Sequence, residues 1–504
     1  MVAQAHTATL MGIDALPVVA EVDLRGGMAK FILVGLPDKA VQESQERVRT
    51  AFKNSDLTFP NGLIVCNLAP GDVRKEGPAL DLPIAMAVLA SSGQVPLSSL
   101  EHTLFMGELG LDGTLRAIDG AVNVALMARS KGIRRMVVPK ANAQEAAVTP
   151  DLEVYGMDNL IQVVELMNGS LFYQPENPAI DPKPDDLAFD IDYADVKGQS
   201  QAIRALEIAA AGGHNALMTG PPGSGKTMLA RRLPTILPPL SLEESIAVTQ
   251  VYSAGGEKGG NSGLIWRRPF RSPHHATSYA AIVGGGKSPK PGEVSLAHHG
   301  VLFLDEMPEF NREVLEALRQ PLEDGVVTVA RVQNTLTFPA DCMLIGAMNP
   351  CPCGYKGYDE AQCVGAAVCL KYGSKISGPL MDRIDLHVQV PRLKPEELTS
   401  APTGEPSEKI RARVLSARER QAARFGSAKS NAKMSPREVK ELVAMDEECL
   451  AFMKTVASRL NLSARVFDRL LKVARTIADL AGSEGVQKAH LAEAVQYRST
   501  SQFD

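Results

Sequence analysis

The stretch Gly220-Pro-Pro-Gly-Ser-Gly-Lys-Thr227 decides the fold of this 504-residue chain. It satisfies the whole phosphate-loop pattern, in which a glycine-rich turn is followed by a lysine and a hydroxyl residue. Glycines let backbone N–H groups close around phosphate oxygens, and a helix N-terminus favours the negative charge. The expected nucleotide-binding residues are Gly220, Pro221, Pro222, Gly223, Ser224, Gly225, Lys226 and Thr227.

The flanks of the loop support this interpretation. The apolar run at residues 215–219 predicts a short buried strand, and residues 228–232 are typical of a helix. In such a strand–loop–helix unit, Lys226 reaches the β- and γ-phosphates of ATP, and the Thr227 hydroxyl is a ligand for Mg²⁺.

A second landmark is the apolar run Val301-Leu-Phe-Leu304, which predicts a buried parallel strand and ends in Asp305 and Glu306. An aspartate at the carboxyl end of such a strand lies beside the phosphate loop and can hold Mg²⁺. Glu306 can act as the general base that activates water, which favours hydrolysis over binding alone. The same two acids are also compatible with an acidic N-cap for a helix at residues 312–319.

Three further candidate catalytic residues, Asn349, Arg383 and Arg465, follow along the chain. A third apolar strand, residues 342–348, ends in Asn349, which could orient the attacking water. Arg383 comes next, and Arg465 opens an amphipathic helix that runs to residue 479. This order resembles the AAA+ ATPases, in which two such arginines stabilise charge on the γ-phosphate, often from a neighbouring subunit. Without the resemblance, a lone arginine is more often part of a surface ion pair.

The segments between these landmarks narrow the resemblance. Residues 268–275, 292–300 and 349–354 look like those of the magnesium-chelatase-like YifB/ComM family, over essentially the whole chain. The resemblance implies a homohexamer that uses ATP and Mg²⁺. It further implies a helicase that acts on single-stranded and branched DNA, promotes branch migration in natural transformation, and has recombination proteins as candidate partners.

Composition agrees with this interpretation. The seven cysteines suit a reducing compartment, and residues 1–20 lack the pattern of a secretion signal. No apolar run approaches about 18 residues, so we expect no membrane span and place the protein in the cytoplasm. The formal net charge of −5 means that any DNA contact must come from local basic surface.

Two polar, proline-rich stretches divide the chain, one at residues 177–186 and a weaker one at residues 394–406. We therefore expect an N-terminal domain (1–175), a linker (176–189), a doubly wound α/β AAA+ core (190–395) and a C-terminal helical lid (396–504). The N-terminal domain resembles the Lon protease fold, an α/β fold of the ribosomal S5 domain 2 type. Ala79 and Val122 stand where the resemblance places the serine and lysine, so the catalytic dyad is absent.

A glycine-rich excursion after Asn349 contains four cysteines, and four thiolates can close a tetrahedral zinc site. The candidate structural Zn²⁺ ligands are Cys351, Cys353, Cys363 and Cys369, with reduced, unligated thiols as the alternative. The adjacent pairs His274–His275 and His298–His299 do not have metal-site spacing, so we expect structural or nucleic-acid-contacting roles.

Two segments are candidates for DNA contact. Residues 325–338 alternate like a hairpin whose turn contains Arg331 and Gln333, and six such tips in a ring would track phosphates. The alternative is a hairpin that only braces subunits. The basic helix at residues 408–425 offers Arg411 and Arg418, although such a run usually forms a solvated face.

Two other functions remain open at this stage. One is a chelatase-type or protein-remodelling motor without DNA activity, which the kinship of the central domain permits. The other is a protease, which the alanine at position 79 argues against.

Overall fold

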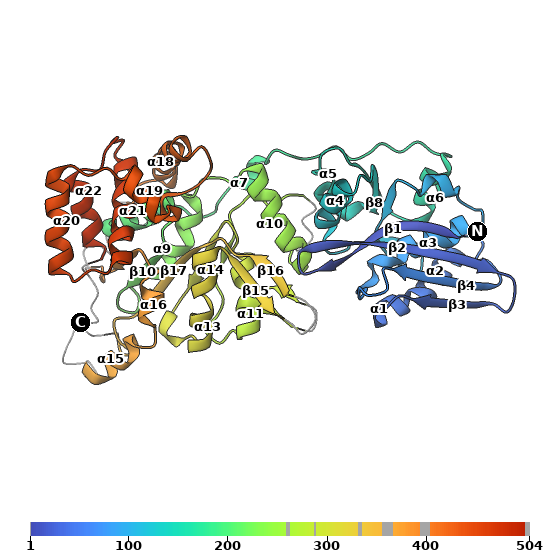
Figure 1. Cartoon of the computed structure of the whole chain (residues 1–504), viewed down its shortest axis with the longest axis horizontal. Helices are drawn as coiled ribbons and strands as arrows, with labels where there is room; N and C mark the ends of the chain where they lie inside the picture. The colour runs from blue at the N-terminus through green and yellow to red at the C-terminus, as the bar shows by residue number, and fades with distance from the viewer. Residues whose placement is uncertain are drawn as a thin grey trace.

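The computed structural model describes residues 2–258, 263–286, 289–330, 335–354, 366–393 and 404–498. Figure 1 shows an N-terminal sheet at one end, a central sheet with its helices in the middle, and a group of helices at the other end. Within the described ranges, no helix is both long enough and apolar enough to cross a membrane.

The N-terminal part is built on a seven-stranded mixed sheet with the order β3-β4-β2-β1-β5-β8-β9. One face packs against α2 and α3, and the other against α4 and α5, so each face buries its own apolar cluster. The strands are β1 (Ala3–Met11), β2 (Asp14–Arg25), β3 (Lys30–Val34), β4 (Leu63–Ala69), β5 (Thr103–Phe105), β8 (Arg135–Pro139) and β9 (Glu153–Met157). The helices are α1 (Lys39–Gln42), α2 (Ser44–Asn54), α3 (Asp81–Ser91), α4 (Ala121–Ser130), α5 (Lys140–Ala147) and α6 (Leu160–Asn168).

The central sheet has five parallel strands in the order β11-β14-β17-β10-β18. Its strands are almost fully buried, as expected when helices cover both faces of a parallel sheet. The strands are β10 (Ala216–Thr219), β11 (Phe270–Arg271), β14 (Val301–Leu304), β17 (Met343–Met348) and β18 (Leu386–Gln389). The three strands that the sequence predicts in this region are therefore confirmed.

Helices and two small hairpins surround this sheet. The single helix predicted at residues 312–319 is instead two, α13 and α14, because Pro321 lacks the N–H that would bond back to residue 317. The helices are α8 (Ser200–Gly212), α9 (Lys226–Arg232), α10 (Leu242–Gly255), α11 (Tyr279–Val283), α12 (Glu293–Leu296), α13 (Arg312–Ala317), α14 (Arg319–Asp324), α15 (Ala366–Gly373) and α16 (Gly378–Met381). The hairpins pair β12 (Gly284–Gly285) with β13 (Lys290–Pro291), and β15 (Val326–Ala330) with β16 (Thr335–Pro339).

The C-terminal helices share one apolar core with the central sheet. This cluster runs from β10 and α8 to α18 and α21, so the helices are packed onto the sheet and are not a separate core. The buried carboxylate of Asp479 fastens them, because it accepts hydrogen bonds from Arg424, Arg475 and Asn431. The helices are α18 (Ser407–Phe425), α19 (Pro436–Leu442), α20 (Glu447–Arg459), α21 (Ala464–Leu480) and α22 (Lys488–Gln496).

The N-terminal part docks onto the central part through α4 and α10. Val122 is fully buried there, in a small apolar cluster with Leu264 and Trp266. At the start of α4, the Gly120 N–H donates to the backbone oxygen of Ser253, 3.1 Å away. The position that the Lon resemblance assigns to the catalytic lysine thus holds an apolar side chain that packs between domains.

Candidate nucleotide site

The phosphate loop, Asp305 and Asn349 meet at one edge of the central sheet. Each follows a parallel strand directly: the loop follows β10, Asp305 follows β14 and Asn349 follows β17. Because β14, β17 and β10 are neighbours in the sheet, their carboxyl ends bring the three elements together. We call this side of the molecule the carboxyl edge.

Lys226 makes the central contacts of the loop. Its Nζ donates to the backbone oxygens of Gly220 at 2.7 Å and Pro221 at 3.0 Å, and to Asn349 Oδ1 at 3.2 Å. Burial lowers the pKa of Lys226, while the nearby charges of Asp305 and Glu306 oppose that shift. These partners are mainly neutral oxygens, which an ATP phosphate can replace with a stronger, charged acceptor.

The backbone of the loop needs its glycines. Gly223 and Gly225 have φ angles of 77° and 92°, which side-chain-bearing residues rarely adopt. At Gly220, a β-carbon would lie 2.1 Å from the backbone oxygen of Val390, which is too close for any contact. The structure thus explains why this loop follows the sequence pattern so closely.

Two candidate oxygen ligands for Mg²⁺ lie side by side. The Thr227 hydroxyl donates to Asp305 Oδ2 at 2.6 Å, which places a hydroxyl and a carboxylate within reach of one ion. Hard oxygen donors of this kind, completed by phosphate and water, are what Mg²⁺ prefers. The residues present therefore fit Mg²⁺ at this position, where Thr227 and Asp305 would hold the ion and it would neutralise phosphate charge.

Glu306 lies at the open side of the site. Its side chain is 56% exposed, and its backbone has a φ of 50°, an unusual value that turns the chain sharply after β14. His275 Nδ1 lies 3.7 Å from Glu306 Oε2, a contact that the sequence analysis missed. The sequence held no local signal for this contact, because residues 272–275 follow β11 and only the strand order makes β11 the parallel neighbour of β14.

Arg383 and Arg465 lie at the opposite edge of the sheet. The Asn215 side chain, directly before β10, donates to the backbone oxygen of Arg383 at 3.0 Å. Both arginines line a cavity of about 980 Å³ on this side, which we call the amino edge. Since the four residues of β10 span roughly 13 Å, neither arginine is placed beside the phosphate loop of its own chain.

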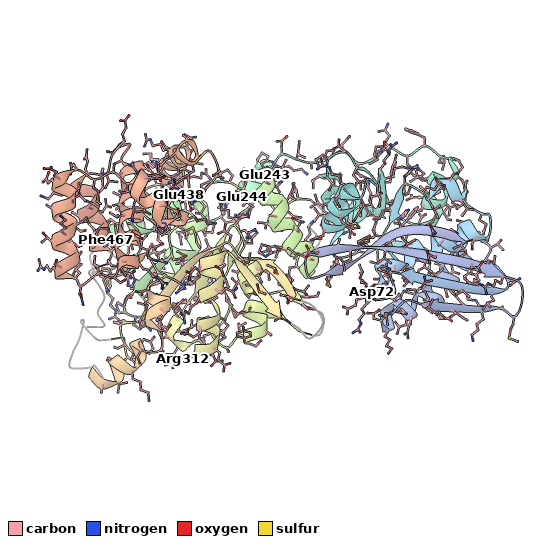
Figure 2. The ribbon with its side chains drawn as sticks, in the orientation of Figure 1. Asp72, Glu243, Glu244, Arg312, Glu438 and Phe467 are labelled. Atoms are coloured by element: carbon pink, nitrogen blue, oxygen red, sulfur yellow. The ribbon has the colours of Figure 1, made fainter. Side chains whose placement is uncertain are left out.

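The amino edge is dense in charge. In Figure 2, Glu244 lies near the start of α10, and its carboxylate pairs with Arg268 at 2.8 Å. Asp385 accepts from His214 and Arg469, and Asp341 forms an ion pair with Lys433. The cations that line the cavity are Arg268, Arg383, Arg418, Lys429, Lys433, Arg465, Arg469 and Lys472.

The arginines of the basic helix α18 were expected to face solvent or DNA. Most of them instead contact acceptors within the protein. Arg418 donates to the backbone oxygen of Ala210 and lines the cavity, and burial lowers its pKa to about 10. Arg413 pairs with Glu207 and Glu405, while Arg411 is half-buried. Acceptors on neighbouring segments hold most of these arginines inward, and the DNA role of Arg411 and Arg418 remains a prediction.

The structure gives no support for the predicted zinc site. Cys351 and Cys353 lie close together, with 3.1 Å between their sulfur atoms, and Cys369 is buried on α15. Among the described residues, no group of three or more His, Cys, Asp or Glu side chains could hold a metal ion. Cys363, Arg331 and Gln333 lie outside the described residues.

A parallel sheet with a phosphate loop after β10 and an acid after β14, two strands away, defines a P-loop nucleotide-binding domain. Comparison with known families specifies the class further. Residues 192–398 match "Magnesium chelatase, subunit ChlI", residues 20–142 match "Subunit ChlI of Mg-chelatase", and residues 404–498 match the ChlI C-terminal region.

Curated relatives match along nearly the whole chain. Competence protein ComM of Haemophilus influenzae is 42% identical over 504 residues, covering 98% of this chain and 97% of the relative. The uncharacterized protein YifB of Escherichia coli is also 42% identical, covering 98% and 96% of the two chains. The chain therefore belongs to the magnesium-chelatase-like ComM/YifB family, as the sequence motifs indicated.

The resemblance of the N-terminal region to Lon proteases is also found among the curated relatives. Lon protease 2 of Thermus thermophilus is 28% identical over 159 residues, which is 29% of this chain and 19% of that protein. Homology to Lon in the N-terminal region is thus shown, whereas the domain boundaries predicted above stay predictions.

Proposed function

We propose that this protein is a homohexameric, Mg²⁺-dependent ATPase that moves along DNA and promotes branch migration of recombination intermediates during natural transformation. The observation that carries the proposal is the split of the ATP machinery between the two edges of the central sheet. Support for the biological role comes from the name of one relative, a competence protein.

The split favours a ring because one chain holds only part of a catalytic site. The carboxyl edge offers Lys226, Thr227, Asp305, Glu306 and Asn349, whereas Arg383 and Arg465 line the amino edge. When the amino edge of one subunit faces the carboxyl edge of the next, the arginines can stabilise the γ-phosphate in trans. Repetition of one such head-to-tail contact closes a ring.

In this arrangement each residue at the carboxyl edge has a defined role. Lys226 leaves its carbonyl partners and binds phosphate oxygens, while Thr227 and Asp305 would hold an ion that would neutralise phosphate charge. Glu306 takes a proton from the attacking water, and Asn349 orients that water. His275, which lies beside Glu306, is placed to orient the Glu306 carboxylate.

The β15–β16 hairpin is the proposed DNA element. The predicted hairpin is confirmed, with Val326 to Ala330 paired antiparallel to Thr335 to Pro339. It lies in the chain between Glu306 and Asn349, and β16 leads directly into β17. A movement of these strands that accompanies ATP hydrolysis can therefore reach the segment between β15 and β16. We place Arg331 and Gln333, which belong to that segment, against the DNA backbone.

The test is the steady-state ATPase rate with and without forked DNA, for the wild-type protein, Glu306→Gln and Arg331→Ala. We expect DNA to stimulate turnover, Glu306→Gln to abolish it, and Arg331→Ala to lose only the stimulation. Unwinding of a labelled fork then tests the helicase directly. Robust hydrolysis that is indifferent to every DNA would refute the DNA motor and favour a chelatase-type or protein-remodelling motor.

A further inference from the structure

The tip of the β1–β2 hairpin leaves the N-terminal sheet and packs on the β15–β16 hairpin. In Figure 1 these two long strands extend from the N-terminal part towards β15 and β16. At the turn, a β-carbon on Gly12 would lie 3.4 Å from the ring of Phe338 and 3.7 Å from Leu336 Cδ1. Met11 and Ile13 pack against the apolar cluster that contains both side chains.

The hairpin tip is fixed from its own domain. Asn123, on α4, donates from Nδ2 to the backbone oxygen of Ile13 at 2.6 Å. At the start of the same helix, Gly120 lies against Leu10, so closely that a β-carbon would be 2.3 Å from Leu10 Cδ1. Since α4 also docks onto α10 through Ser253, the tip is held by a helix that is itself attached to the ATPase core.

The surface that receives the tip is the base of the proposed DNA hairpin. Phe338 is fully buried, and the Ala340 N–H donates to the backbone oxygen of Gly325 at 2.8 Å, which closes the base. A few residues later β17 begins, and it ends before Asn349, the partner of Lys226. A shift of the base would therefore displace both the paired strands β15 and β16 and the strand that leads to the candidate ATP site.

We propose that Met11, Gly12 and Ile13 form a brace that positions the β15–β16 hairpin and couples the N-terminal domain to it. This inference rests on the proposed function, because it assigns the Lon-like domain a role in controlling the DNA element. The domain lacks the Lon dyad, and its hairpin sets the orientation of the paired strands β15 and β16. Nucleotide binding does not involve the brace, so basal hydrolysis persists without it.

The test compares the double variant Met11→Ser/Ile13→Ser with Met28→Ser, both in the full-length protein. Met28 is a matched control because it is 89% exposed in the turn after β2 of the same domain. In the double variant we expect DNA stimulation to fall by about fivefold while the DNA-free rate changes by less than about twofold. The control variant should behave like the wild type in both measurements.

Hydrogen exchange of β16 gives a second readout that does not need DNA activity. In the double variant, amides of residues 335–339 should exchange faster than in the wild type and in Met28→Ser. Unchanged exchange of α3 shows that the N-terminal domain is folded. If the wild type responds to DNA and the double variant responds equally, or if β16 exchange is unaltered, the brace is wrong. If no DNA stimulates the wild type, the proposed function fails. The exchange result alone then decides whether Met11, Gly12 and Ile13 position the β15–β16 hairpin.

Discussion

At the carboxyl edge of the central sheet, Lys226 is held by two backbone oxygens and an amide oxygen. At the amino edge, Arg268, Arg469 and Lys433 are instead held by carboxylates. A cation on neutral acceptors gains when a phosphate arrives, whereas a cation already in an ion pair loses a charged partner. The difference separates groups that are ready to bind a ligand from groups that hold the structure.

Arg383 and Arg465 are the amino-edge cations that the sequence predicts to act on ATP, whereas Arg418 and Lys472 donate to backbone oxygens within the fold. Arg465 is exposed on α21, and Arg383 pairs with Glu323, whose side chain is 58% exposed. Glu323 can return to water when this pair opens, whereas the Arg383 side chain, only 12% exposed, then needs another acceptor. The guanidinium Nε of Arg383 is buried and has no hydrogen-bond partner within the described part of the chain. These features suit a residue that acts on a neighbouring subunit.

The largest expected effect comes from removing this arginine. Arg383→Ala should lower kcat by about 10⁴-fold, the range of arginine fingers, while Arg437→Ala, an exposed arginine on α19, should have no effect. An equal mixture of Arg383→Ala and Lys226→Ala should regain up to about a quarter of the wild-type rate, because random rings contain interfaces with both intact halves. No recovery in mixed rings would mean that the two edges do not share a site.

A substitution at the carboxyl edge should be able to remove hydrolysis without removing nucleotide binding. Glu306→Gln should lower kcat by about 10³-fold, because the amide cannot accept the proton from water. ATP affinity, measured with a fluorescent nucleotide, should stay close to wild type since Lys226 and Thr227 are intact. Glu309→Gln is the matched control, an exposed acid three residues later that pairs with Lys375. Equal turnover in the two variants would remove Glu306 from the catalytic role.

A structural ion pair at the amino edge should respond through stability. Burial opposes ionisation of Asp385, but hydrogen bonds from His214 and Arg469 hold its pKa well below the ordinary value of 3.8. Its contribution is therefore present above that value and lost as the pH falls further. Asp385→Asn should cost about 3 kcal/mol at neutral pH, because Arg469 and His214 lose a buried carboxylate.

Hydrogen exchange of α21 amides over a pH series checks this expectation. Protection in wild type should decline below about pH 4, and the Asp385→Asn variant should lack that part of the decline. Asp382→Asn, which changes a half-exposed acid, serves as the control. Equal protection of α21 in both variants at neutral pH would show that the Asp385 pair is not structural.

The smallest expected effect is a pH slope from His298. Burial first, and then the charge of His299, lowers the pKa of His298, and its Nδ1 accepts the Asp341 N–H at 3.1 Å. Below the ordinary value of 6.5 the unfolded chain takes up a proton that the folded chain does not, so stability falls as the pH drops. The slope should be about 1 kcal/mol per pH unit between pH 6 and pH 5.

His298→Asn keeps an oxygen acceptor in place of Nδ1 and removes the titration. Thermal midpoints between pH 8 and pH 5 should therefore fall less steeply in this variant than in wild type, while exposed His102→Asn should follow the wild type. A slope that His298→Asn leaves unchanged would assign the pH dependence to other groups.

Motifs within one strand and its following turn were predictable, because their geometry depends on a few adjacent residues. The phosphate loop, Asp305 and Asn349 were placed correctly at strand ends, and the β15–β16 hairpin was confirmed. The position of His275 beside Glu306 was missed, since it depends on β11 being the neighbour of β14. The division of the predicted helix at residues 312–319 into α13 and α14 was missed, because Pro321 lies beyond the predicted range.

The sequence by itself determined the family, the phosphate-loop fold class and the residues that meet at the carboxyl edge. Only the tertiary structure decided that Arg383 lies at the edge opposite Lys226, that α18 turns most of its arginines inward, and that Gly12 lies against Phe338. The physical reason is the separation in sequence between the residues that specify each feature. A phosphate loop is specified by the backbone freedom of eight adjacent residues, whereas contacts between distant segments depend on strand order and on which acceptors and apolar side chains the whole fold brings together.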